Sequence, residues 1–221
     1  MKITLARYSP GVPIDVFADV PELELRVSGR RRKFSRGEVV FHEGDPGDSL
    51  HRVASGRFAA RVTTPVGDVA TFAVHGPAEV FGLLAVVHPA ARRTATVVAL
   101  QASETFAIPR SAFLRLKGTY PGVATATEQL LVEMLTASSS RLVEALYTPV
   151  HLRVRARLRD LARIYGGDGS EPVAIPLSQE DIAGLAGTTR ETVNRVLRDE
   201  QERGAVTLAR RRITVLPGAL M

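Results

Sequence analysis

The segment 188–197, TTRETVNRVL, carries the side chains with the most evident chemistry in this chain. A guanidinium group donates two hydrogen bonds to O6 and N7 of guanine, and a carboxylate accepts one from the amino group of cytosine. At helical spacing the polar residues fall on neighbouring exposed faces, whereas Val193, Val196 and Leu197 point inward. The segment therefore predicts a helix that reads base edges in the major groove through these residues: Arg190, Glu191, Asn194 and Arg195.

A simpler interpretation is that the same residues only build the helix. Thr188 and Glu191 match the S/T-x-x-E capping box, and Glu191 and Arg195 have the spacing of an intrahelical ion pair. Thr189, at the start of the helix, could bind a phosphate together with free backbone N–H groups. The segment by itself leaves both interpretations open.

The flanking elements favour the interpretation as a DNA-reading helix. Residues 177–187 offer Ser178 as an N-cap, acidic residues in the first turn and a glycine stop, which predicts a helix just before this one. Two helices joined by a tight turn that contains glycine form a helix-turn-helix unit. Residues 206–215 predict a hairpin with three arginines at or beside its turn, a basic wing suited to the phosphate backbone. Further candidate DNA contacts are Ser178, Thr188, Thr189 and Arg211.

Between Gly122 and Pro149 the chain contains neither glycine nor proline, which predicts one long helix. Residues at alternating four-residue and three-residue steps form a heptad seam: Ala124, Glu128, Leu131, Leu135, Ser138, Leu142 and Ala145. So narrow a stripe predicts a parallel two-stranded coiled coil, although a helix packed on its own domain is the alternative. Ser138 is polar in the middle of the seam, so it either fixes the register or contacts a bound ligand.

Residues 34–108 alternate short β-rich runs with glycine turns. The runs lie at 39–41, 50–54, 58–62 and 69–74, and glycines fall where tight turns need a positive φ or a close backbone approach. This spacing predicts an antiparallel roll or barrel. Beyond the long helix, residues 150–165 predict an arginine-rich helix that opens a small C-terminal domain.

Length and composition exclude several classes of protein. The 221 residues are enough for two modest domains, and 45% hydrophobic with 24% charged residues is typical of a folded protein. The absence of cysteine excludes disulfide scaffolds, thiolate zinc sites, cysteine-held iron–sulfur clusters and cysteine nucleophiles. Residues 150–221 hold 12 arginines and 9 acidic residues, and the rest of the chain holds 17 basic and 14 acidic ones. The net charge of +6 is therefore evenly split and is weak evidence for nucleic acid.

Membrane, metal and enzyme functions are disfavoured as well. The first ten residues lack a continuous apolar core, and the most apolar window, 69–87, is broken by polar residues, glycine and proline. We therefore expect a cytoplasmic protein with no membrane contact. The five histidines contain no i, i+4 pair, so we expect structural roles for them rather than heme or metal binding. We expect no enzymatic activity, because no grouping of nucleophile, base and acid emerges.

Two stretches resemble the CRP/FNR family of bacterial transcription regulators. Residues 179–197, with RETVNRVL at 190–197, are similar to the C-terminal domain of that family. The run RGEVVFHEGDPGDSLHRVASG at 36–56 is similar to its cyclic-nucleotide-binding β-roll. Both occur in the family's order, and with the connecting helix the resemblance covers about residues 20–216.

The resemblance implies an α+β fold in three parts. These are an N-terminal antiparallel β-roll sensor domain at 1–118, a dimerisation helix at 119–148 and a winged helix-turn-helix domain at 149–221. It also implies a homodimer that binds a pseudo-palindromic site in double-stranded DNA and contacts RNA polymerase. Within that site, the resemblance assigns base reading to Arg190, Glu191 and Arg195.

The predicted ligand site departs from the family pattern at one position. Cyclic-nucleotide-binding relatives carry F-G-E-L-A and then R-S/T-A, whereas this chain has FGLLA at 81–85 and RTA at 93–95. Arg93 and Thr94 stand in the phosphate slots, where a guanidinium and a hydroxyl can bind an anion. Leu83 replaces the carboxylate that would accept the ribose 2′-hydroxyl, so a bound nucleotide would leave that hydroxyl unpaired. Candidate ligand contacts are Gly82, Leu83, Leu84, Arg93, Thr94, Ser138 and Ser139.

Two alternatives remain open at this site. Arg93 is either an anion clamp or an arginine that pairs with a local acid such as Glu79 or simply meets solvent. The effector is not identified, and we expect cyclic AMP binding to be weak or absent because of Leu83. The main functional hypothesis is a sequence-specific DNA-binding regulator. The alternative is a cyclic-AMP-responsive signalling module whose C-terminal domain mediates protein contacts, and Leu83 argues against it.

Overall fold

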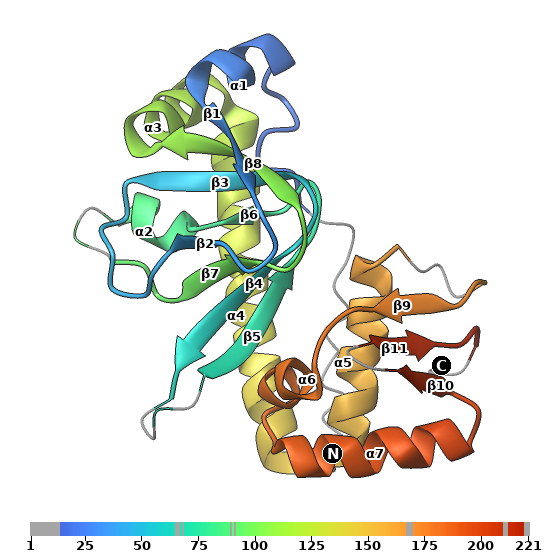
Figure 1. The fold of residues 1–221 in the computed structure, drawn as a ribbon. Helices are drawn as coiled ribbons and strands as arrows, with labels where there is room; N and C mark the ends of the chain where they lie inside the picture. Colours follow the sequence, from blue (N-terminus) through green and yellow to red (C-terminus); the bar gives the residue numbers. More distant parts are fainter. Residues whose placement is uncertain are drawn as a thin grey trace.

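The computed structural model describes residues 14–64, 67, 69–88, 90, 92–166, 170–209 and 212–218. It consists of a β-roll, a long helix beside the roll and a C-terminal domain of helices with a small sheet (Figure 1). This is the α+β class expected from the sequence. Arg211, a candidate DNA contact, lies outside the described residues. Within those residues, no helix combines the length and the apolar character that crossing a membrane requires.

The described β-roll contains two antiparallel four-stranded sheets, ordered β1-β8-β3-β6 and β2-β7-β4-β5. The strands are β1 (Arg30–Phe34), β2 (Val39–Phe41), β3 (Ser49–Ser55), β4 (Phe58–Thr63), β5 (Val69–His75), β6 (Val80–Phe81), β7 (Thr96–Ala99) and β8 (Ser103–Pro109). The accompanying helices are α1 (Glu22–Ser28), α2 (Leu83–Val87) and α3 (Arg110–Thr119). The β-rich runs expected at 39–41, 50–54, 58–62 and 69–74 fall within β2, β3, β4 and β5. The antiparallel roll is confirmed.

Aromatic side chains fill the space between the two sheets. Phe34 of one sheet meets Phe58 of the other edge to face, with ring centroids 5.6 Å apart. Phe81 lies 5.2 Å from Phe58, and all three rings are buried. Inward-facing residues of both sheets thus form one core, as expected where two sheets pack face to face.

His51 lies in this core, stacked on the Phe81 ring with centroids 5.1 Å apart. Its Nδ1 lies 3.1 Å from the hydroxyl of Thr105, which is also buried. Burial, and then the nearby positive charges of Arg93 and Arg32, lower the pKa of His51 to about 3. The ring is therefore neutral in the folded protein at any pH well above 3.

We expect His51 to make the protein less stable in mild acid. In the unfolded chain the imidazole takes up a proton near its ordinary pKa of about 6.5, but the folded chain does not until about pH 3. The free energy of unfolding should therefore fall by roughly 1.4 kcal/mol for each pH unit below about 6.5. Urea unfolding at pH 7.5 and 5.5 measures this, with His51→Gln as the control. If the free energy of unfolding of His51→Gln falls by the same amount between pH 7.5 and 5.5, His51 is not the cause.

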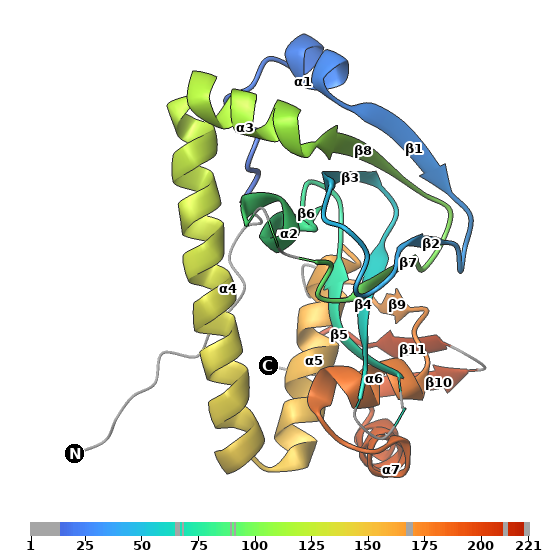
Figure 2. The ribbon, with the colours of Figure 1, turned by 90° about the vertical axis from the view of Figure 1, so that its left-hand side faces the viewer.

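A single long helix, α4 (Pro121–Tyr147), follows α3 and runs along one side of the β-roll (Figure 2). Its extent agrees with the helix predicted between Gly122 and Pro149. Two seam residues, Leu135 and Leu142, are 70% and 63% exposed. Ser138, also exposed, donates its hydroxyl to the Met134 carbonyl at 2.8 Å. The predicted seam thus leaves leucines without cover in the single chain.

The C-terminal domain begins with α5 (Val150–Ile164), which turns back from the lower end of α4 (Figure 2). It continues with β9 (Val173–Ile175), α6 (Gln179–Ala186), α7 (Arg190–Glu202), β10 (Val206–Ala209) and β11 (Arg212–Val215). The strands form a small antiparallel sheet in the order β10-β11-β9. Leu158 of α5, Ile182 of α6 and Leu197 of α7 meet in its buried core.

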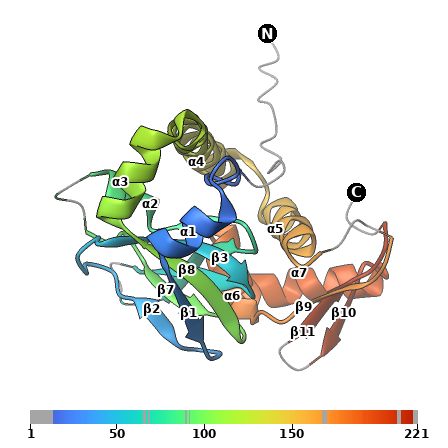
Figure 3. The same cartoon turned by 90° about the horizontal axis from the view of Figure 1, so that it is seen from above.

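The C-terminal domain packs against the β-roll, with α6 nearest to it (Figure 3). Arg61 of β4 donates to the Asp181 carboxylate at 3.0 Å, and the Thr71 hydroxyl of β5 donates to the same carboxylate oxygen at 2.7 Å. Arg57 donates twice to the Ile164 carbonyl, at 2.8 and 3.0 Å. These contacts fix the position of α6, and hence of the helix that follows it, relative to the β-roll.

Gly184 of α6 lies directly on the backbone of β5. A Cβ at this position would stand 2.6 Å from the Thr71 nitrogen and 2.8 Å from its carbonyl oxygen. Backbone atoms cannot rotate away as a side chain can, so a methyl group here would push α6 off the strand. Only glycine allows this approach.

We expect Gly184→Ala to loosen the contact between the domains without unfolding either of them. Alanine stabilises a helix by about 1 kcal/mol over glycine, so α6 itself should persist. Faster hydrogen exchange in both α6 and β5 is the expected result. Gly118→Ala is the matched control, because Gly118 lies in α3 and an added methyl group there would have no atom within 4 Å. Unchanged exchange in Gly184→Ala would contradict the steric argument.

Candidate functional site

The first helix of the predicted DNA-reading unit is α6, and Ser178 caps it. The Ser178 hydroxyl accepts from the Asp181 backbone N–H at 3.1 Å, and the Asp181 carboxylate accepts from the Ser178 N–H at 3.1 Å. Burial raises the pKa of Asp181, but hydrogen bonds from Ser178 and Thr71 outweigh it and lower the pKa overall. The carboxylate therefore stays charged while it serves both the cap and the contact with Arg61. Ser178 is placed as a cap, and a phosphate contact by it stays a prediction.

The turn between α6 and α7 is held by an arginine that sequence reasoning did not assign. Gly187 ends α6 with a φ of 60°. Arg153 of α5 donates to the Ala186 carbonyl at 3.0 Å and to the Gly187 carbonyl at 3.1 Å. It thereby satisfies carbonyl groups that a helix end leaves free. The sequence feature that points to such a role for Arg153 is the arginine-rich composition of residues 150–165.

The second helix, α7, begins at Arg190 and is capped by Thr189. The Thr189 hydroxyl accepts from the Thr192 N–H at 3.3 Å. The alternative capping box of Thr188 with Glu191 is therefore wrong by one residue, because the adjacent threonine takes the cap position. Hydrogen bonds from its own backbone N–H and from Thr189 lower the pKa of Glu191, which is thus a carboxylate at neutral pH.

The faces of α7 divide as the sequence predicts, except at Asn194, which was expected to be exposed. Val193, Val196 and Leu197 are buried in the domain core. The opposite face lies at the outer end of the molecule, away from the β-roll (Figure 1). Asn194 is half-buried, and its side-chain oxygen accepts from Gln179 of α6 at 3.4 Å. The exposed candidates on this helix and its cap are Thr189, Arg190, Glu191 and Arg195.

A charged cluster around a buried carboxylate fixes the C-terminal half of α7. Glu200 is 2% exposed, and its Oε1 accepts from Arg203 at 3.0 Å. Its Oε2 lies 3.6 Å from Nε of Arg155 on α5. Sequence reasoning missed this carboxylate, although its position three residues after Leu197 continues the inward pattern of the helix. The cluster connects α7 to α5 on the side opposite the exposed arginines.

The predicted wing is present as the β10–β11 hairpin. Ala209 pairs with Arg212 across it, and residues 210–211 between them lie outside the described residues. Arg212 is exposed at the first position of β11. The hairpin follows α7 directly, which is the order of a winged helix-turn-helix domain.

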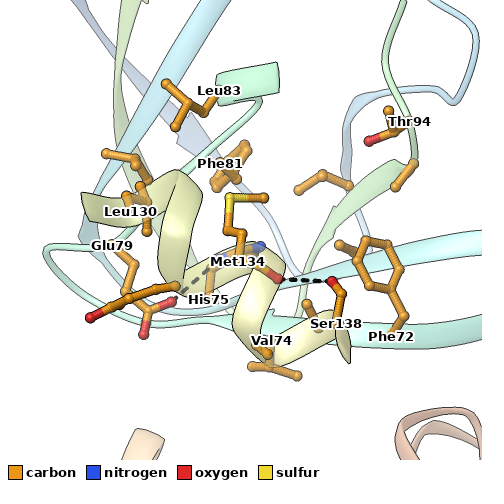
Figure 4. A pocket seen from close by; sticks show the side chains of 18 of the residues that line it. Phe72, Val74, His75, Glu79, Phe81, Leu83, Thr94, Leu130, Met134 and Ser138 are labelled. Atoms are coloured by element: carbon orange, nitrogen blue, oxygen red, sulfur yellow. Dashed lines mark hydrogen bonds and ion pairs between the residues drawn. The ribbon is translucent and has the colours of Figure 1, made fainter. Parts of the chain in front are cut away.

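A second candidate site is a cavity of about 490 Å³ between the β-roll and α4 (Figure 4). Phe72 and Val74 of β5, Phe81 of β6, and Leu130 and Met134 of α4 project into it (Figure 4). The predicted ligand residues that line it are Gly82, Leu83, Leu84, Arg93, Thr94 and Ser138. Ser139 is exposed on α4 and is not among the lining residues.

Arg93 is buried at one end of the cavity. Its Nη2 lies 3.1 Å from the Asp48 carboxylate and 3.1 Å from the Ser49 hydroxyl, and its guanidinium stacks 4.0 Å over the Phe41 ring. Gly82, with a φ of 82°, leaves room for it, because a Cβ there would lie 2.5 Å from Nη1. Burial lowers the pKa of Arg93, while Asp48 raises it in part.

The acid that pairs with Arg93 is not Glu79. Glu79 instead lies 3.3 Å from Nδ1 of His75, four residues earlier, and Asp48 takes the arginine. Leu83 is 3% exposed and joins the core formed with Leu50 and Ile108. The position that would hold a carboxylate for ribose is therefore apolar and enclosed. In the described residues, no group of three or more His, Asp or Glu side chains could hold a metal ion.

Comparisons with known proteins agree with both halves of the chain. The model of the cyclic nucleotide-binding domain matches residues 31–120, and that of the Crp-like helix-turn-helix domain matches residues 152–218. The CRP-like cAMP-activated global transcriptional regulator of Mycobacterium tuberculosis is 32% identical, over 79% of this chain and 79% of that protein. The Cyclic AMP receptor protein of Thermus thermophilus is 33% identical over 90% of each. The structure of FixK2 from Bradyrhizobium japonicum has a TM-score of 0.71 at 21% identity, covers 85% of this chain and 92% of that one, and shares the fold.

Proposed function

The chain belongs to the CRP/FNR family of transcription regulators, and from this we propose that it works as a homodimer that reads a pseudo-palindromic DNA site with α7. The observation that carries the proposal is the exposed face of α7. Arg190, Glu191 and Arg195 are exposed there, while the opposite face is buried in the domain core. Such a helix can enter the major groove with its donors and acceptors at the base edges.

Phosphate contacts would hold this helix in register. Thr189 is exposed at the N-terminus of α7, where backbone N–H groups favour an anion. Arg212 and the neighbouring Arg211 would contact the backbone from the wing. Ser178 and Asn194 are engaged in contacts within the domain, so we propose positioning roles for them.

The homodimer is proposed from the exposed side chains of α4. Leu135, Leu142 and Leu146 are 70%, 63% and 65% exposed, and a folded chain does not leave a row of leucines in water without cause. A second α4 in parallel register would cover them. The pair would place two copies of α7 about 34–36 Å apart, one turn of DNA.

The effector is proposed to differ from the one that the two relatives' names indicate. Both relatives are named for cyclic AMP, but Leu83 removes the acceptor for a ribose hydroxyl here. We propose that cyclic AMP binds weakly or not at all, and isothermal titration with a micromolar or tighter affinity would contradict this. A role as a signalling module without DNA binding would need an intact nucleotide site, which Leu83 disfavours. Contact with RNA polymerase in the cytoplasm is proposed from family membership alone.

The decisive experiment is selection of DNA sites from random duplexes with the purified full chain. The expected result is enrichment of two inverted half-sites whose centres lie about 10 base pairs apart. Gel-shift titration of the enriched duplex then gives the affinity, with and without cyclic AMP. Failure to enrich any sequence in either condition would contradict the proposal.

A further inference from the structure

We propose that the cavity beside α4 binds an amphipathic anion, an apolar molecule with one carboxylate or similar oxyanion, rather than a nucleotide. The proposed effect on DNA binding rests on the function proposed above, but the binding itself does not. The cavity is about 490 Å³, large enough for a medium-sized organic molecule. Its chemistry, at the walls and at one end, selects the class of ligand.

The walls are mostly apolar, and Glu79, paired with His75 at 3.3 Å, lines one side of the cavity (Figure 4). Phe72 and Phe81 approach from the strands, and Leu83, Leu130 and Met134 face them from α2 and α4 (Figure 4). An aliphatic or aromatic body would gain by leaving water here. Ribose hydroxyls would find no carboxylate at Leu83, and the Ser138 hydroxyl already donates to the Met134 carbonyl. The walls therefore favour a hydrocarbon body over a sugar.

At one end of the cavity, Arg93 offers a positive charge and an N–H group that makes no hydrogen bond in the described part of the chain. The Arg93 side chain is 2% exposed, and its Nε has no hydrogen-bond partner within the described residues. Its partner Asp48 is 82% exposed, so water weakens the pair on that side. An unpartnered buried N–H is costly, and an oxyanion in the cavity would satisfy it. The exposed Thr94 hydroxyl, also in the lining, is a second donor.

The other end of the cavity reaches the C-terminal domain. Leu161 and Ile164 of α5 and Leu185 of α6 belong to its lining. A bound molecule would thus touch the β-roll, α4 and the domain that carries α7 at the same time. Its binding would favour the docked arrangement, because undocking would expose the apolar body to water. The proposed ligand is therefore suited to be the effector.

Binding can be tested by isothermal titration of the full chain with three probes: decanoate, decan-1-ol and cyclic AMP. Decanoate is expected to bind at least tenfold more tightly than decan-1-ol, because only the carboxylate can accept from Arg93. It is also expected to bind more tightly than cyclic AMP. Equal affinities for decanoate and decan-1-ol, or tighter binding of cyclic AMP, would overturn the proposal.

Variants locate the binding in the cavity. Ala137 of α4 lines it, so Ala137→Trp should fill the space and weaken decanoate binding at least tenfold without touching Arg93. Thr136→Trp is the control, because Thr136 is exposed on α4 and not part of the lining. Arg93→Gln should remove the preference for decanoate over decan-1-ol, with thermal melting as a check of folding. If Ala137→Trp binds decanoate as tightly as the unchanged chain, decanoate does not bind in this cavity.

The role as effector has a separate readout. Fluorescence anisotropy on the selected duplex, with and without decanoate, is expected to show at least a fivefold change in DNA affinity. An unchanged affinity despite decanoate binding would leave a ligand site but overturn the effector role. Failure of the chain to bind any duplex, with decanoate still bound in the cavity, would overturn the proposed function and not this site.

Discussion

Arg190→Ala and Arg195→Ala are each expected to abolish most of the sequence-specific DNA affinity while leaving the fold intact. Each arginine, bidentate to a guanine, discriminates by about 1–3 kcal/mol, and a dimer on two half-sites loses this twice, about 2–6 kcal/mol in all. The specific dissociation constant should rise by roughly 30-fold to 10⁴-fold. Because both side chains are exposed, thermal stability should not change by more than about 0.5 kcal/mol.

Anisotropy titration of the selected duplex and of a scrambled duplex distinguishes the loss of a base contact from the loss of a positive charge that attracts any DNA. Arg198→Ala is the control, since Arg198 is exposed later on the same helix and its replacement removes an equal charge. It should weaken binding to both duplexes by a similar factor, as loss of a phosphate contact does. If Arg190→Ala and Arg195→Ala also weaken both duplexes equally, α7 does not read bases.

The double substitution Leu135→Glu with Leu142→Glu is expected to convert the dimer into a monomer. Both leucines lie on the predicted seam and are mostly exposed, so the glutamates should leave the single chain folded. In a parallel pair each would face its own copy, which places like charges together in the seam. A monomer reaches only one half-site, so DNA affinity should fall by about 10²–10⁴-fold.

Sedimentation equilibrium measures the mass, and gel shift measures the affinity. Leu23→Glu is the control, because Leu23 is 75% exposed on α1 and is not part of the predicted seam of α4. It should remain dimeric and bind DNA as before. A double variant that stays dimeric would show that another surface holds the two chains together.

The sequence predicts the fold and the division of α7 into a buried and an exposed face, because both depend on local periodicity. The inward pattern of Val193, Val196 and Leu197 follows from helix geometry alone. The capping box of Thr188 with Glu191 fits the sequence motif, but the helix begins one residue later, with Thr189 as its cap. Such a boundary is decided by the tertiary position of the turn, which Arg153 holds from another helix.

Ion pairs between residues far apart in the sequence could not be predicted. Arg93 pairs with Asp48, 45 positions away, and Arg61 pairs with Asp181, 120 positions away. Neither choice has a local signal, since several acids were available to each arginine. The buried Glu200 was missed for a related reason, because a charged side chain on a helix is usually exposed and one of its two arginine partners, Arg155, lies on α5.

The core of the C-terminal domain is not made by that domain alone. Val74 of β5 is buried within it, and Leu100 of the β-roll packs against it. A boundary drawn at residue 149 therefore cuts through shared hydrophobic packing. A chimera that joins residues 149–221 to another sensor domain would expose the hydrophobic surface that β5 covers here. The C-terminal domain should therefore be transferred together with β5.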